Sequence, residues 1–138
     1  MALLSAEELT AFLHESFPAG AEREHNMSVE AVDDSTIRMR LRVAPGDLRP
    51  GATISGPTIF ALVDCVAWLV TLAQLGPGRD AVTSSVTINY LRRPSLGDLV
   101  GEGRLLKLGR RLAVVDVLVY SDGAPDPIAQ ASVTYAPV

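Results

Sequence analysis

The chain has 138 residues, of which 48% are hydrophobic and 20% are charged, a composition typical of a soluble globular protein with one domain. Its formal net charge of −4 lacks the basic surplus of nucleic-acid-binding proteins, so nucleic acid is not an expected partner. The single cysteine, Cys65, excludes an internal disulfide framework, and no signal-peptide pattern is present at the N-terminus, so we expect a cytoplasmic protein.

The N-terminal segment, residues 1–20, predicts a short amphipathic helix. Ser5 and Glu8 have the spacing of a capping box, and Pro18 and Gly20 end the helical pattern. The apolar residues at helical spacing are Leu9, Phe12, Leu13 and Phe17. Residues 27–43 then alternate between apolar and polar side chains, which predicts two strands. The arginines of the second strand, Arg38, Arg40 and Arg42, are interpreted as a solvated outer face, with an anion-binding face as the alternative.

Residues 57–75 are apolar on all sides of a helix, which is typical of a helix enclosed by other structure. Ser55 or Gly56 is the expected N-cap, and Pro57 suits the first helical position. A membrane-spanning helix is the competing interpretation. The central acid Asp64 and the absence of a basic flank before the helix argue against it, so no membrane partner is expected.

Asp64 is the one acidic residue inside this helix, and no Lys or Arg lies within two turns of it. A carboxylate taken out of water is costly unless it is paired, hydrogen-bonded or functional. Asp64 is therefore a candidate functional acid that should resist ionisation relative to a solvated carboxyl. The alternative is a structural acid that caps a loop or meets an arginine from another segment.

Residues 80–136 predict four strands joined by turns, with Gly101 and Gly103 indicating strong bending or a bulge in the second strand. The order is helix, two strands, long apolar helix and four strands. It predicts an α+β fold in one domain, residues 1–138, in which a curved antiparallel sheet of five to six strands wraps around the central helix.

Two motifs, in this order, resemble those of the PaaI-like acyl-CoA thioesterases, which have the hotdog fold. The first is Ser-Gly-Pro at 55–57 with Leu-Val-Asp at 62–64, where the family usually has His-Gly-Gly and Leu-Ala-Asp. The second is Tyr-Leu-Arg-Arg-Pro at 90–94 followed by Leu-Gly-Asp at 96–98. The resemblance covers residues 27–136. It implies hydrolysis of an acyl-CoA thioester, with coenzyme A as part of the substrate and with no separate cofactor or metal.

The resemblance also implies site residues. The family's acid falls on Asp64, as general base or direct nucleophile, and its oxyanion-binding backbone N–H falls on Gly56. The helix dipole at that position favours a developing oxyanion. A strand serine that assists the attacking water in some members falls on Ser84. The expected cations for the CoA phosphates are Arg92, Arg93, Arg110 and Arg111.

Other positions depart from the family pattern. Ser55 replaces the usual histidine but could orient the thioester through its hydroxyl, and Arg49 stands where an Asn or Gln is frequent. The substrate pocket is therefore expected to differ from that of the best-known members. Trp68 walls the acyl pocket or packs in the core, and Cys65 is expected to be an inert buried thiol.

The spacing of Gly56 and Asp64 predicts an assembly. Eight residues correspond to about 12 Å along a helix, too far for both groups to act on one carbonyl. A two-fold axis that sets two such helices antiparallel would bring Gly56 of one chain to the partner's Asp64. We therefore expect a homodimer with shared active sites and, beyond it, a homotetramer, although the sequence does not decide between dimer and tetramer.

Two other functions compete with the thioesterase. An acyl-thioester hydratase or dehydratase needs a catalytic histidine, and the chain has none after His25. A non-catalytic module that binds acyl-CoA is the main alternative, because the family's histidine and amide positions are replaced. A serine hydrolase of the nucleophile-elbow type is excluded by the absence of a Gly-x-Ser-x-Gly motif.

Overall fold

The computed structural model describes residues 2–138. The helices are α1 (Ala6–Ser16), α2 (Glu22–His25) and α3 (Gly56–Leu75), with a 3-10 turn at Pro45–Asp47. The strands are β1 (Met27–Val32), β2 (Thr36–Leu41), β3 (Leu48–Arg49), β4 (Thr53–Ile54), β5 (Ala81–Tyr90), β6 (Leu99–Leu108), β7 (Ala113–Ser121) and β8 (Ala129–Pro137).

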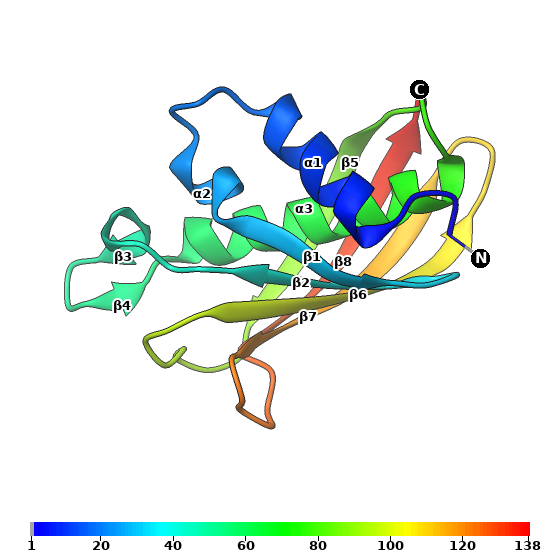
Figure 1. Ribbon diagram of the computed structural model, residues 1–138. Helices are drawn as coiled ribbons and strands as arrows, with labels where there is room; N and C mark the ends of the chain where they lie inside the picture. The colour runs from blue at the N-terminus through cyan, green and yellow to red at the C-terminus, as the bar shows by residue number, and fades with distance from the viewer. Residues whose placement is uncertain (1) are drawn as a thin grey trace.

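Six strands form one antiparallel sheet in the order β1-β2-β6-β7-β8-β5. Figure 1 shows this sheet curving around α3, with α1 alongside α3 on the same side of the sheet. The short β3–β4 hairpin lies at the end of the molecule where α3 begins. This is the hotdog fold that the resemblance implied; the sequence did not predict the β3–β4 hairpin or α2.

The enclosure of α3 explains its composition. Twelve of its twenty residues are buried, and they are spread around the helix instead of forming one stripe. By length and composition alone, this helix could cross a membrane; in the fold, its apolar surface is covered by the sheet and by α1. Ser55 is the N-cap, so the helix begins at Gly56 and Pro57 takes the second helical position, one later than expected.

Gly101 and Gly103 do not form a β-bulge, which was one of the two features that the sequence indicated for β6. Both pair in regular register with β2 and β7, and the irregularity of β6 lies later, between Leu105 and Lys107. A Cβ added at Gly101 would stand 2.8 Å from Val66 Cγ2, and one added at Gly103 would stand 2.6 Å from Val66 Cγ1. The two glycines are therefore required by the close approach of α3 to the sheet.

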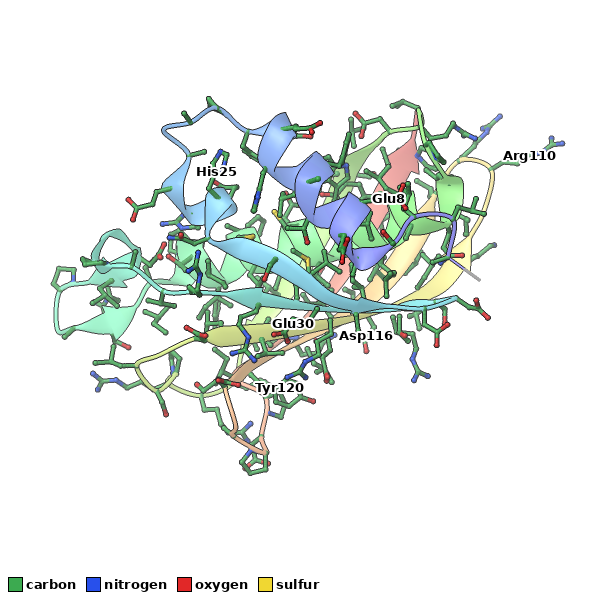
Figure 2. The ribbon with its side chains drawn as sticks, viewed as in Figure 1. Glu8, His25, Glu30, Arg110, Asp116 and Tyr120 are labelled. Carbon is green, nitrogen blue, oxygen red and sulfur yellow. The ribbon has the colours of Figure 1, made fainter. Side chains whose placement is uncertain are left out.

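The face of the sheet away from α3 carries paired charges. Arg40 lies 2.7 Å from Glu30, 3.1 Å from Asp98 and 2.9 Å from Asp122, and Arg38 pairs with Glu30 and Glu102. Figure 2 shows Glu30, Asp116 and Tyr120 on this side of the molecule. Because these arginines are already neutralised by carboxylates, the arrangement favours the solvated outer face over an anion-binding face.

Substitution of Gly103 by Ala should lower the free energy of unfolding by about 1–3 kcal/mol, because the new methyl group overlaps Val66 and forces α3 away from β6. Urea denaturation measures this change. Gly20→Ala is the matched control, since a Cβ at Gly20 meets nothing within 4 Å. Equal stability of the two variants would show that α3 can shift without cost.

The carboxylates on Arg40 should make stability depend on acid pH. Hydrogen bonds from Arg40 hold the pKa of Glu30 and of Asp122 below their ordinary values of 4.5 and 3.8. A lowered folded-state pKa contributes stability that is present above the ordinary value and is lost as the pH falls through the folded value.

Arg40→Gln should therefore be less stable than the wild type at about pH 7 and should lose less stability between about pH 5 and pH 3. Urea unfolding across this range measures both differences. Arg42→Gln removes the same charge from an exposed arginine that forms no ion pair within residues 2–138, so it is the control. Parallel pH profiles for the two variants would contradict the assignment.

Candidate active site

The start of α3 presents one free backbone donor. The Ser55 hydroxyl accepts from Thr58 N at 3.2 Å and contacts Thr58 Oγ1 at 2.8 Å, so it serves as the helix cap. Pro57 has no N–H, and the Gly56 N–H has no acceptor among the described residues. Gly56 therefore offers the positive end of the helix to an incoming ligand.

Tyr90, at the end of β5, holds this helix start. Its hydroxyl donates to the Gly56 carbonyl at 3.0 Å, and its ring lies 3.7–3.9 Å from the position of a Cβ on Gly56. The aromatic residue of the second sequence motif thus contacts the glycine of the first. Partial burial raises the pKa of Tyr90, which keeps its hydroxyl protonated as a donor.

A buried acid that the sequence analysis did not single out anchors the loop before α3. Asp47 is 3% exposed and accepts from Arg23 Nε at 2.6 Å and from Thr58 Oγ1 at 3.3 Å. Its backbone carbonyl accepts from Ser55 N at 2.9 Å. Arg49, two residues later on β3, is exposed and makes no side-chain contact to Gly56 among the described residues, so its role in substrate binding stays a prediction.

Asp64 lies on α3 where the helix faces β8 and β5, and it is half-buried. Tyr135 of β8 donates to Asp64 Oδ1 at 2.6 Å, and Thr83 of β5 donates to the same oxygen at 2.9 Å. Asp64 Oδ2 has no hydrogen-bond partner within the described part of the chain. The carboxylate is therefore held by two hydroxyl groups through one oxygen while its second oxygen remains available.

The hydroxyl beside Asp64 is that of Thr83 and not that of Ser84. Thr83 pairs with Tyr135 and Ser85 pairs with Thr134, so the ladder skips Ser84, which is the extra residue of a β-bulge. Ser84 is exposed and makes no hydrogen bond to Asp64 among the described residues. Its assistance to an attacking water stays a prediction.

A pocket of about 370 Å³ opens next to Asp64. Trp68, one turn further along α3, forms one wall, and its Nε1 donates to Asp80 at 3.1 Å. Phe17, which follows α1, meets Trp68 edge-on with ring centroids 6.3 Å apart. The pocket is thus an apolar recess with a carboxylate at its side, of the kind that accommodates part of a small ligand.

Cys65 also lines this pocket but is 6% exposed. Burial raises the pKa of its thiol far above the ordinary value, and the neighbouring Asp64 carboxylate adds to the shift. The thiolate that nucleophilic chemistry requires is therefore disfavoured, which agrees with the expected inert thiol.

The structure separates the four candidate CoA-binding arginines into two pairs. Arg92 and Arg93 follow β5 close to Tyr90, and Arg92 donates to the Pro127 carbonyl. Arg110 and Arg111 lie on the turn between β6 and β7, at the opposite end of the sheet, and Figure 2 shows Arg110 extending away from the molecule. All four are exposed, but one protomer does not bring them together.

Sequence reasoning missed Thr83, Tyr135 and Phe17. Residues 83–85 read Thr-Ser-Ser, so a hydroxyl near Asp64 was foreseeable, but the bulge that selects Thr83 depends on pairing with β8. Tyr135 was only one residue of the last predicted strand, with no functional role assigned. The contact of Phe17 with Trp68 depends on how α1 packs on α3.

Comparison with known proteins places this site in a family. The model of the thioesterase superfamily matches residues 51–127, which include the start of α3, Asp64 and β5. A protein from Silicibacter sp. TM1040, whose crystal structure is described as that of a candidate thioesterase, is 40% identical, and the match covers 100% of this chain and 94% of that one with a TM-score of 0.89.

Two further proteins are similar to this chain. A Streptococcus mutans UA159 protein, solved with bound acetyl-CoA, is 30% identical over 83% of this chain and 90% of its own, with a TM-score of 0.72. A Saccharolobus solfataricus protein named as a candidate esterase is 29% identical over 106 residues, which are 77% of this chain and 69% of that protein. Because the superfamily model spans more than half of the sequence and the Silicibacter protein matches all of it, the chain belongs to the thioesterase superfamily.

Proposed function

We propose that this protein is an acyl-CoA thioesterase in which Asp64 activates the attacking water. The observation that carries the proposal is the arrangement at Asp64, which lines a mainly apolar pocket. Its Oδ1 accepts from two hydroxyl groups, and its Oδ2 has no hydrogen-bond partner among the described residues. A carboxylate held in this way can accept a proton from a water molecule without rotating. The acetyl-CoA bound to the Streptococcus mutans relative supports a CoA thioester as the ligand class.

In the proposed reaction, Asp64 Oδ2 takes a proton from water as the water oxygen attacks the thioester carbonyl carbon. The carbonyl oxygen becomes an oxyanion, and a Gly56 N–H at a helix start donates to it. The tetrahedral intermediate then collapses, the C–S bond breaks, and the CoA sulfur leaves with the proton that Asp64 carried. The products are a carboxylic acid and free CoA. Direct attack by Asp64 on the carbonyl is the variant of this scheme that forms an acyl-enzyme anhydride.

The Gly56 N–H and the Asp64 carboxylate of one chain are about 12 Å apart along α3, too far to act on the same carbonyl. In this scheme the two groups of one site therefore belong to different chains. β5 is an edge strand of the sheet, and no strand among the described residues pairs with its outer side. A ten-residue edge strand with exposed Val82, 52% accessible, favours pairing with another chain. We propose that two copies of β5 pair antiparallel around a two-fold axis.

The contacts of β5 support one register for this proposed pairing. Thr83 near its start contacts Asp64, and Tyr90 at its end contacts Gly56. An axis that passes midway between positions 83 and 90 sets Thr83 opposite the partner's Tyr90. The same operation brings Asp64 of one chain to the partner's Gly56, so each dimer contains two shared sites.

In this dimer, one of the two pairs of candidate CoA-binding arginines lies near the shared site and the other pair does not. Arg92 and Arg93 are two and three residues after Tyr90, so they accompany Gly56 to the shared site, and we propose that they bind the CoA phosphates. Arg110 and Arg111 lie at the other end of the protomer and are weaker candidates. The recess walled by Trp68 would receive the acyl group.

Asp64→Asn should reduce the rate of CoA release at least about a hundredfold, because an amide cannot accept the proton of water. The assay measures CoA released from a panel of short, medium and aryl acyl-CoAs at equal amounts of folded protein, and the best substrate identifies the acyl class. Unchanged turnover by the variant would show that Asp64 is structural. Binding of acyl-CoA without turnover by either protein would instead establish the non-catalytic binding module.

The shared site can be tested by mixing two inactive variants. Gly56→Pro removes the N–H but suits the helix start, since Ser55 already has the extended conformation required before proline. Gly56→Ala, which keeps the N–H and adds a Cβ in ordinary contact with Tyr90, is the control and should retain activity.

Refolding equal amounts of the Asp64→Asn and Gly56→Pro chains together should restore about a quarter of the wild-type activity, because half of the dimers are mixed and each mixed dimer has one intact site of two. CoA release before and after mixing is the measurement. No recovery, in mixtures shown by mass spectrometry to contain mixed dimers, would place both groups of one site in the same chain.

A further inference from the structure

The last strand supplies the shortest hydrogen bond to Asp64. Tyr135 Oη lies 2.6 Å from Asp64 Oδ1 and 3.1 Å from the Asp64 backbone carbonyl, and its single proton can serve the nearer oxygen. A distance of this size is typical of an O–H group that donates to a charged carboxylate. We propose that Tyr135 is a positioning residue, which fixes the Asp64 carboxylate through Oδ1 and directs Oδ2 toward the attacking water.

The tyrosine is itself rigidly held. It is 4% exposed and belongs to the core, and its backbone pairs with Ala113 of β7 on one side and Thr83 of β5 on the other. A side chain fixed by packing in this way loses little entropy when it holds a second group. Tyr135 can therefore restrict the rotamer of Asp64, which the helix alone leaves free.

The Tyr135 hydroxyl remains protonated, and so remains a hydrogen-bond donor, at every pH at which the protein would work. Burial raises the pKa of Tyr135 well above its ordinary value of 10, and the hydrogen bond to Asp64 raises it further. Because the phenol stays neutral, it stabilises the ionised form of Asp64 by donation and does not compete with it for a proton.

Few other ionisable groups surround this pair. Asp80, in the loop before β5, lines the same pocket but accepts from Trp68 Nε1 and from Ala81 N. Cys65 stays a neutral thiol, and Glu24 of α2 acts on Cys65 only through space. No basic side chain of the described residues forms an ion pair with Asp64. The two hydroxyls are thus the direct donors that compensate the charge of Asp64.

The proposal rests on the proposed function of Asp64, and Tyr135→Phe tests it with the ring and its packing retained. We expect kcat to fall about tenfold or more while KM changes less than about twofold, because a hydrogen bond to a charged group is lost and substrate contacts are not.

Three controls separate a positioning role from a structural one. Tyr120→Phe makes the same change on the outer face of the sheet (Figure 2) and should leave kcat and KM unchanged. Thr83→Val removes the other donor to the same oxygen and should also lower kcat more than it changes KM. Tyr135→Phe added to Asp64→Asn should cause no further loss, because Tyr135 acts only through the carboxylate.

The last test uses the unmodified protein, so it does not depend on whether a variant folds. In the NMR spectrum, the Tyr135 hydroxyl proton should exchange slowly with water and resonate far downfield, because it is buried and donates to a carboxylate at 2.6 Å. A hydroxyl proton that exchanges rapidly with water would overturn the proposal. Wild-type kcat in Tyr135→Phe, with Asp64→Asn impaired, would overturn it and leave the proposed function standing. Full activity of Asp64→Asn would overturn both.

Discussion

The close contact of α3 with the sheet is the constraint on which the rest of the structure depends. Val66 of α3 occupies the space that Cβ atoms at Gly101 and Gly103 would fill, so helix and sheet approach more closely than two side-chain layers allow. The sheet curves around the helix and buries twelve of its residues. Asp64 is half-buried on this helix, where Thr83 of β5 and Tyr135 of β8 contact it beside the sheet edge.

That position determines the chemistry available to Asp64. The hydroxyls of Tyr135 and Thr83 satisfy one carboxylate oxygen, which lowers the cost of keeping a charge away from bulk water. The other oxygen has no hydrogen-bond partner among the described residues, and Asp64 lines a mainly apolar recess together with Trp68 and Phe17. Asp64 is thus neither fully enclosed nor neutralised by an arginine. Its carboxylate therefore remains available to react with a water molecule.

The edge strand links this site to assembly. β5 carries Thr83 toward Asp64 and Tyr90 toward the start of α3, so a single strand touches both halves of the proposed catalytic machinery. Its outer side lacks a strand partner among the described residues. If two copies pair there, assembly and completion of the active site become one event, since neither chain alone holds the oxyanion donor and the acid within reach of one carbonyl.

The sequence by itself determined the two longer helices, the six strands of the main sheet and the unusual position of one acid. Uniform apolarity from residue 57 to residue 75 indicated an enclosed helix, the alternation in the strands indicated a sheet around it, and Asp64 was conspicuous because local residues offered it no partner. Only the tertiary structure decided which groups meet that acid: a bulge at Ser84 turns Thr83 toward it, and Tyr135 reaches it from 71 residues away. It also showed that Gly101 and Gly103 make room for a helix. Periodicity reports which face of an element is apolar, whereas register, bulges and close approaches arise from contacts between distant segments.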